Sequence, residues 1–291
     1  MKSKSYFSFF TLSLFTLLLL SCEKPYIDEA AGTPATPHGN LTVSVFQLEQ
    51  TPFSSITRTA PADACTRLNF AVYKPDGSRE KQVNQTSTDA DFGQATFQLE
   101  EGTYQLVVVA HSSNGNPTMT NPAKIQFDNS DGFSDTFLYS EEVTIGGEPL
   151  DLSLTLNRIV ALCRFVITDD YPQGVAKMQF KYTGGSGSFN ASTGQGCVKS
   201  TQQVTYDVTA GQKQFDLYTF PYQSQECTIH LTATALDVNS NVLHERTFDV
   251  SLECNKISWF SGAFFTTSNT TSTISSLNLN TAWAAESQYN Y

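Results

Sequence analysis

Cys22 is the residue whose type and position point most clearly to chemistry, because it closes a segment with the features of a secretory signal. Two lysines make the start of the chain basic, residues 6–20 are mostly apolar, and the small Ser21 precedes the cysteine. A cysteine at this place is typical of a bacterial lipoprotein. We therefore predict that residues 1–21 are a signal peptide and that Cys22 carries a diacylglycerol on its sulfur and an acyl chain on its amine. The alternative, an uncleaved anchor helix, would need more apolar residues than follow Cys22.

Five further cysteines offer a second kind of chemistry, since disulfides form outside the cytoplasm. The five are Cys65, Cys163, Cys197, Cys227 and Cys254. Their odd number predicts at least one free thiol. A hairpin with its turn centred on Ser240 and Asn241 would place Cys227 directly opposite Cys254, where a disulfide needs only a local adjustment. Two buried thiols are the alternative, because a single bulge would shift this register.

The patterns typical of metal sites and catalysis are weak. The four histidines have no metal-ligand spacing, and we expect them to be exposed on sheets. They are His38, His111, His230 and His244. The turn at 128–135 does not fit the calcium loop of an EF-hand, and the glycine-rich stretch 183–188 opens no helix that could hold a phosphate. We expect a solvated turn and a flexible hairpin loop there, in a protein that is not an enzyme and has no cofactor.

The composition excludes some partners and indicates the fold class. Charged residues make up 15% of the chain, against about 25% in a typical protein, and aromatic residues reach 12%. Long helices carry many charged residues on their exposed faces, whereas Thr, Tyr, Phe and Val favour strands. Removing the signal with its two lysines leaves 15 basic and 28 acidic residues, a formal charge of −13. We expect no binding to nucleic acid, and the lipid alone would hold such a chain to a membrane.

Strand signals fill the rest of the chain in two series. Residues 22–39 contain three prolines and no apolar period, which predicts an extended, lipidated tether. Apolar and polar residues then alternate between turn residues over 40–155, and again over 156–291. The alternation runs without a linker from one series into the next. We therefore predict an all-β protein with two antiparallel β-sandwich domains in tandem, joined stiffly.

Six segments, in this order, resemble the FimB-like fimbrial anchor and fimbrillin-associated lipoproteins of type V fimbriae. They are CTRLNFAVYKPDG (65–77), LEEGTYQLVVVAHSSNG (99–115), LNRIVALCRFVITDDYP (156–172), YTGGSGSFNASTGQG (182–196), LYTFPYQ (217–223) and NKISWFSGAFF (255–265). The resemblance implies two transthyretin-like sandwiches and a place in an adhesive fibre, with other fimbrial subunits as partners. It also implies a surface-exposed location at the cell outer membrane, where members anchor the fibre base or act as accessory subunits.

The same resemblance implies a second fate for the chain. Shaft subunits of this system are trimmed by an arginine-specific protease, and loss of the first strand opens a groove that a neighbour's strand fills. Arg58 is the only basic residue between Lys24 and Arg67. A cut between Arg58 and Thr59 would release the predicted strand 41–48 together with the lipid. An ordinary arginine in a polar loop is the alternative.

The C-terminal tail could donate the strand that fills such a groove. Leu277, Leu279, Thr281 and Trp283 alternate with polar or small residues, although the tail could equally complete its own domain. Three functions therefore stay open. The chain could be an anchor or accessory subunit that joins its neighbours by strand complementation, or a shaft or tip subunit matured at Arg58. It could also be a surface lipoprotein that binds carbohydrate or a host protein, which an exposed platform of Tyr and Trp would favour.

Overall fold

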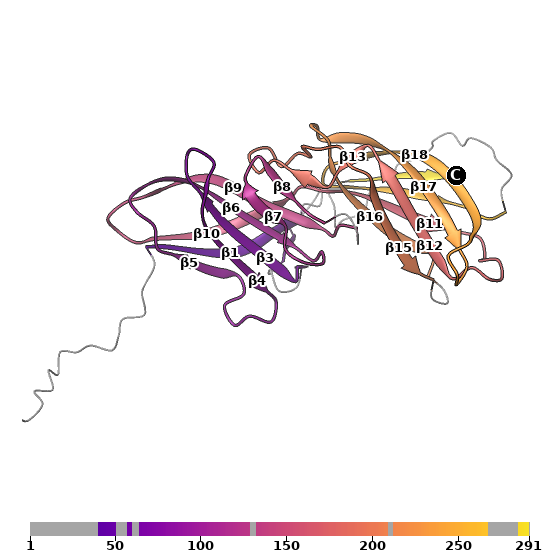
Figure 1. The fold of residues 1–291 in the computed structure, drawn as a ribbon, viewed down its shortest axis with the longest axis horizontal. Helices are drawn as coiled ribbons and strands as arrows, with labels where there is room; N and C mark the ends of the chain where they lie inside the picture. The colour runs from indigo at the N-terminus through magenta and orange to yellow at the C-terminus, as the bar shows by residue number, and fades with distance from the viewer. Residues whose placement is uncertain are drawn as a thin grey trace, which may run out of the picture. The chain divides into compact units, whose positions relative to one another are not determined.

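The described part of the chain is built from β-strands. The computed structural model describes residues 40–50, 57–59, 64–128, 132–208, 212–266 and 285–290. These residues belong to one compact unit, Gly39–Tyr291. Its labelled elements are all strands, as the composition and the alternation predict (Figure 1). No helix in the ranges given above is long and apolar enough to cross a bilayer.

The first series of strands forms one eight-stranded sheet. Its members are β1 (Leu41–Gln50), β2 (Thr57–Thr59), β3 (Arg67–Tyr73), β4 (Arg79–Thr86), β5 (Gln94–Phe97), β6 (Gly102–His111), β9 (Thr136–Ile145) and β10 (Leu150–Arg158). Their order is β2-β1-β10-β9-β6-β3-β4, with β5 also paired to β1. Strands β9 and β10 pair only over Phe137–Leu138 and Asn157–Arg158, so the sheet divides into two layers at this point. Leu48 from one layer and Leu106 from the other belong to the same core.

The second series of strands forms two separate sheets. One has the order β13-β16-β11-β19-β20 and the other the order β15-β12-β17-β18. Their bounds are β11 (Ala161–Ile167), β12 (Lys177–Thr183), β13 (Gly185–Ser186), β15 (Gln202–Asp207), β16 (Gln214–Pro221), β17 (Glu226–Leu236), β18 (Val242–Glu253), β19 (Lys256–Gly262) and β20 (Ala285–Asn290). The core between the two sheets is rich in aromatic rings, with Phe165 against Phe180 at 5.2 Å between centroids.

A third core and a small sheet contain residues of both series. Strands β7 (Thr118–Asn121) and β8 (Lys124–Gln126) pair with β14 (Ser188–Phe189) of the second series. In the shared core Phe127 stacks on Phe220, with 5.8 Å between ring centroids. Two residues separate β10 from β11, so the predicted continuous passage between the series is nearly uninterrupted. The two series are therefore joined by apolar packing as well as by the chain.

Candidate functional site

Strand β1 has an internal position although it begins the described part of the chain. It runs parallel to β10, from Leu41 opposite Leu150 to Glu49 opposite Asn157. Its other edge is covered first by β5 and then by β2. Strand β1 therefore has neighbours on both sides.

The side chains that β1 sends into the core are almost completely buried. Leu41, Val43, Val45 and Leu48 are at most 6% exposed. Burying an apolar side chain of this size stabilises a fold by about 1.5–3 kcal/mol. Strand β1 is thus an integral part of the first core, and its removal would leave an apolar groove.

A bulge interrupts the alternation along β1. The register with β10 shifts between Val45 and Gln47, and Phe46 between them is 65% exposed. An extra residue in a strand reverses the faces on which the following side chains lie. The bulge therefore explains why Leu48, three residues after Val45 rather than two, still faces the core.

Arg58 and Thr59 lie in the short strand β2 and not in a loop, which corrects the predicted setting of this candidate cleavage site. Arg58 lies opposite Glu49 of β1, and Thr59 lies opposite Leu48. Strand β2 pairs antiparallel with β1, so the backbone at Arg58 is extended. Strand β2 stands at the end of its sheet. A three-residue strand paired on one side can separate from its neighbour at small free-energy cost.

The described chain also ends in a parallel strand. Strand β20 pairs with β19, from Ala285 opposite Lys256 to Asn290 opposite Ser261. It stands at the edge of its sheet, next to β19 alone. The predicted donor residues lie outside the described residues, as does Cys22. These donor residues are Leu277, Leu279, Thr281 and Trp283.

Asp169 holds the backbone that follows β19. Its carboxylate accepts hydrogen bonds from the N–H groups of Phe264, Phe265 and Thr266, at 2.8, 2.7 and 2.9 Å. The hydroxyl of Thr266 adds a fourth bond at 3.1 Å. Burial acts to raise the pKa of Asp169, but the four hydrogen bonds outweigh it, so the pKa lies below its ordinary value. The end of β19 is therefore fixed by a charged group.

The turn between β17 and β18 closes earlier than the sequence predicts. The N–H of Asp237 donates to the carbonyl of Asn241 at 3.0 Å. Its carboxylate accepts the N–H groups of Asn239 and Asn241, each at 2.8 Å. A bulge follows between Ala235 and Leu236, so the register of the whole hairpin differs from the predicted one.

This register corrects the predicted pairing of Cys227 with Cys254. Cys227 lies opposite Leu252, and Cys254 lies just beyond the end of β18. Both cysteines are free thiols in the structure. Burial raises the pKa of each thiol to about 11. The two residues are offset along the hairpin, and a disulfide would require the strands to shift.

Residues 185–188 of the glycine-rich stretch 183–188 are buried, and most of the stretch is paired, which corrects its interpretation as a flexible loop. Gly185–Ser186 forms β13 against β16, and the next strand, β14, pairs with β8. Gly184 has φ of +98°, and a Cβ there would lie 2.2 Å from the carbonyl oxygen of Thr228. A Cβ on Gly185 would lie 2.0 Å from Oγ1 of Thr219. These glycines permit close approach of the backbone, so they indicate tight packing here and not mobility.

His111 is fully buried, contrary to the expectation of an exposed sheet histidine. Its Nδ1 accepts the N–H of Ser113 at 3.1 Å, so Nε2 carries the proton and donates to Oδ1 of Asn69 at 2.8 Å. Burial, aided by the charge of Arg67, lowers the pKa of His111 to about 4. A neutral histidine is satisfied inside the sheet by these partners, and alternation alone does not reveal them.

The other histidines have different settings. His230 is exposed, as predicted, and its Nδ1 lies 2.5 Å from the carboxylate of Asp249. His244 is half-buried against the rings of Phe264 and Phe265. His38 lies outside the described residues.

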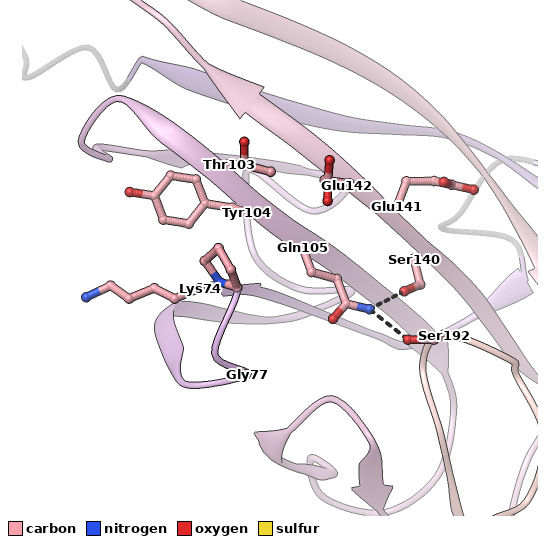
Figure 2. A pocket seen from close by; sticks show the side chains of 10 residues that line it. Lys74, Gly77, Thr103, Tyr104, Gln105, Ser140, Glu141, Glu142 and Ser192 are labelled. Atoms are coloured by element: carbon pink, nitrogen blue, oxygen red, sulfur yellow. Dashed lines mark hydrogen bonds between the residues drawn. The ribbon is translucent and has the colours of Figure 1, made fainter.

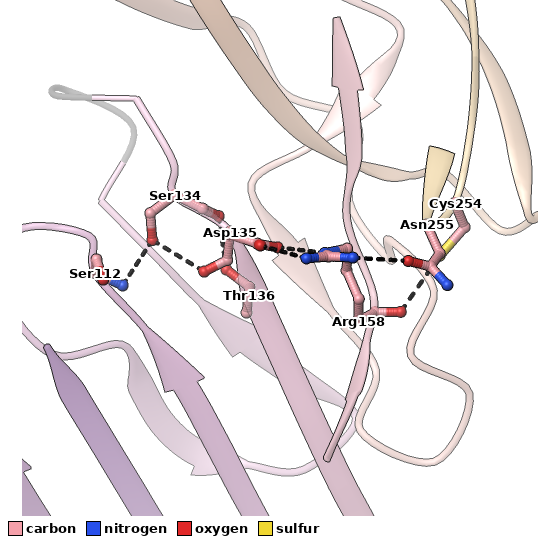
Figure 3. Close-up of polar contacts among 7 residues, drawn as sticks. All are labelled: Ser112, Ser134, Asp135, Thr136, Arg158, Cys254 and Asn255. Carbon is pink, nitrogen blue, oxygen red and sulfur yellow. Dashed lines mark hydrogen bonds and ion pairs between the residues drawn. The ribbon is translucent and has the colours of Figure 1, made fainter. Parts of the chain in front are cut away.

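Arg158 forms a buried ion pair within the first series of strands and a hydrogen bond to the second series. Arg158 is 5% exposed, and its Nε and Nη2 each donate to the carboxylate of Asp135 at 2.7 Å (Figure 3). Its Nη1 donates to Oδ1 of Asn255 at 3.0 Å. The sequence signal for this cluster is a charged residue in an apolar position, since Leu154 and Leu156 precede Arg158 on the buried face of β10. Arg158 and Asp135 are not among the residues predicted from the sequence.

The positions of β1 and β20 in their sheets form the candidate functional site. The place of β1 is enclosed and apolar, and the edge at β20 has one neighbour. An unpaired strand edge or an emptied groove accepts the strand of another chain through main-chain hydrogen bonds, with apolar side chains adding specificity.

Comparisons with known proteins give a family and a set of similar solved structures. The model of a family of unknown function, DUF6562, matches residues 35–290. No curated protein matches the chain. A candidate adhesin from Bacteroides ovatus is 16% identical, with 74% of this chain and 84% of that chain covered and a TM-score of 0.47. A fimbrial assembly protein from Parabacteroides distasonis is 12% identical, with 77% and 90% covered and a TM-score of 0.42.

The third structure is the fimbrial anchor protein Mfa2 from Porphyromonas gingivalis. It is 14% identical, with 71% of this chain and 80% of that chain covered and a TM-score of 0.40. Identities and TM-scores of this size carry no argument about function. What the chain does must be argued from its own residues.

Proposed function

Since the chain belongs to the family of unknown function DUF6562, we propose its function from its residues: a lipid-anchored structural subunit of a bacterial adhesive fimbria. It acts as an anchor or accessory subunit and joins its neighbours by strand complementation. It is not an enzyme, and its partners are other fimbrial subunits and the outer membrane. The resemblance to FimB-like anchor lipoproteins and transthyretin-like domains supports this assignment.

The observation that carries the proposal is the link from Cys22 to the first core. Residues 23–40 connect the lipidated cysteine to β1, a reach of about 60 Å when fully extended. Strand β1 is covered on both edges and buries four apolar side chains. A pull on the folded unit is therefore transmitted to the lipid through a strand that cannot leave without opening the core. An anchor needs this continuity.

A second fate is favoured by the position of Arg58. The extended backbone of β2 lies at a sheet edge, where a protease has better access than in a sheet interior. A cut after Arg58 would separate β1 from the rest of the unit and convert the lipid-bound form into a shaft or tip subunit. The emptied place of β1 would then accept a strand from a neighbour.

Mass spectrometry of the protein isolated from cells tests both fates. An anchor retains the acylated Cys22 as its first residue, whereas a matured shaft subunit begins at Thr59. A chain that begins at Thr59 would overturn the anchor proposal. The Arg58→Ala variant should leave an anchor unchanged and should block release of a shaft subunit.

Substitution of the lipidated cysteine provides a second test. The Cys22→Ser variant should leave the membrane fraction and appear in a soluble fraction, while fibres of the remaining subunits lose their attachment or change in length. The matched control is Cys197→Ser, which removes a thiol inside the folded unit. Equal membrane attachment of both variants would contradict the lipid anchor.

A further inference from the structure

An open crevice lies where the second series of strands meets the outer face of the first sheet. Its volume is about 390 Å³, near the lower end of the range of about 300–1,000 Å³ that small-molecule sites span. Its walls come from the β3–β4 turn, from β6, from β9 and from the loop after β14 (Figure 2). Both series of strands therefore contribute to it.

Gln105 organises the floor of this crevice. Its Nε2 donates to Oγ of Ser140 at 2.9 Å and to Oγ of Ser192 at 3.3 Å (Figure 2). Because both serine oxygens accept from Gln105, both hydroxyl hydrogens remain available to donate. The amide oxygen of Gln105 has no hydrogen-bond partner among the residues that the structure describes. The floor thus presents donors and an acceptor side by side.

The loop that carries Ser192 is held in place before any ligand arrives. The N–H of Ser192 donates to Oδ1 of Asn190 at 2.9 Å, and the N–H of Gly194 donates to the carbonyl of Asn190 at 2.8 Å. The N–H of Ala191 donates to the carbonyl of Pro122 at 2.8 Å. Ordering this loop therefore costs little free energy on binding.

One carboxylate faces the floor. Glu142 is the cross-strand partner of Gln105, so the two side chains lie on the same face of the sheet. Glu141, the next residue along β9, points to the opposite face. Within the described residues Glu142 forms no ion pair or hydrogen bond, and no cluster of three metal-ligating side chains occurs there. Glu142 adds a strong acceptor without forming a chelating pair.

The charge of the crevice excludes anions. Lys74 is the one cation in its wall, and its Nζ is paired with the carboxylate of Glu80 at 2.8 Å. A phosphate or sulfate would meet Glu142 without a free positive partner. A neutral polyol matches the donors and acceptors of the crevice better, since each of its hydroxyls can both donate and accept a hydrogen bond.

We propose that this crevice binds a neutral, hydroxyl-rich ligand, such as one sugar ring, between Gln105, Ser140, Ser192 and Glu142. This site is separate from β1, β2 and β20, so it would add recognition of a saccharide to a subunit whose strands join it to its neighbours. The crevice is open, and its one aromatic lining residue, Tyr104, is buried and offers no exposed ring face, so the affinity for one sugar ring is weak, in the millimolar range.

Titration of the isotope-labelled mature chain, residues 22–291, followed by amide NMR, tests the proposal. The probes are D-mannose, D-galactose and N-acetyl-D-glucosamine, with sulfate and methylammonium as charged probes. The expected result is a saturable shift of the amide signals of Gln105, Ser140 and Ser192 with at least one neutral sugar. Absence of such shifts with all three sugars, or shifts with a charged probe alone, would overturn the proposal.

Two variants locate the binding. Ser192→Ala removes a hydroxyl group, and Glu142→Gln replaces one charged acceptor oxygen with an amide donor. Each change should weaken binding by about three- to tenfold. Their matched controls are Ser251→Ala and Glu148→Gln, both exposed and outside the crevice, which should leave binding unchanged. All four positions are exposed, so folding is preserved. Equal affinity of the crevice variants and their controls would refute the site.

Discussion

The described chain begins and ends with a parallel strand, and the two strands differ in how they are held. Strand β1 has β10 on one side and β5 with β2 on the other, and its side chains fill the first core. Strand β20 is shorter and has β19 as its one neighbour. Loss of β20 leaves a sheet with a new edge, whereas loss of β1 leaves an open core. Cutting the chain near its two ends should therefore have very unequal effects.

Removal of β1 should have the largest effect. A chain that starts at Thr59 loses four buried apolar side chains, worth about 6–12 kcal/mol in total, which is comparable to the whole stability of about 5–15 kcal/mol of a typical domain. We expect it to aggregate, and to fold when a synthetic peptide of residues 41–50 is supplied. Gel filtration and circular dichroism measure both results.

The matched control is a chain that ends at residue 284 and lacks β20. It should stay folded and monomeric. If that chain aggregates while the chain starting at Thr59 stays folded, the contrast between the enclosed and the edge strand is wrong.

Breaking the ion pair of Arg158 with Asp135 should have the next largest effect. Asp135→Ala removes the carboxylate that neutralises the buried guanidinium of Arg158. Such a loss costs about 3–5 kcal/mol of stability in a fully buried pair. It should cost less here because the Asp135 side chain is 24% exposed. Urea unfolding should show a loss of about 2–3 kcal/mol. The control Asp151→Ala, an exposed residue of β10, should change stability by less than about 0.5 kcal/mol.

His111 should make the first series sensitive to mild acid. Its pKa is about 4 in the folded state and about 6.5 in an unfolded chain, so the unfolded chain binds more protons between these values. Stability therefore falls as the pH drops from about 6.5 to 4, by up to about 3 kcal/mol. Thermal melts over this range measure the loss. In the control His230→Gln the loss should persist, because His230 is exposed.

Asp169 should give the smallest effect, in a lower pH window. Its folded-state pKa is depressed, so its contribution is present above the ordinary pKa and is lost as the pH falls through the folded value. At neutral pH Asp169→Asn should cost about 1 kcal/mol, because a neutral amide oxygen accepts hydrogen bonds less strongly. Below the folded-state pKa of Asp169 the variant and the native chain should converge. A constant difference at all pH values would exclude the charge as the cause.

The strands themselves could be predicted from the sequence, and most of their partners could not. Alternation places a strand at residues 41–48, within two residues of the bounds of β1, because the period of 2 is a local property of a half-buried strand. The parallel pairing of β1 with β10 joins residues more than 100 positions apart, and no local pattern specifies it. Side-chain closure of the Asp237 turn decided the register of β17 and β18, which a count from an assumed turn centre could not foresee.

Polar residues inside the fold account for the other corrections. Arg158 occupies a strand position where alternation predicts an apolar side chain, whereas His111 is buried where an exposed side chain is expected. Each is satisfied by a partner distant in the sequence. Glycines 184 and 185 resemble a loop in composition, yet they serve close packing against Thr228 and Thr219. In both cases the residue type is informative only together with a neighbour that the fold supplies.

The bulge at Phe46 sets the spacing of the apolar side chains that the groove beneath β1 accepts. Its apolar positions follow the spacing two, two and three, from Leu41 through Val43 and Val45 to Leu48. A strand that replaces β1 must have one extra residue before its last apolar side chain. Without it, that side chain would face solvent. Leu277, Leu279, Thr281 and Trp283 keep an unbroken step of two. The C-terminal tail of another copy of this chain therefore does not match the last apolar position of β1. A segment with the interrupted spacing would fit the groove better.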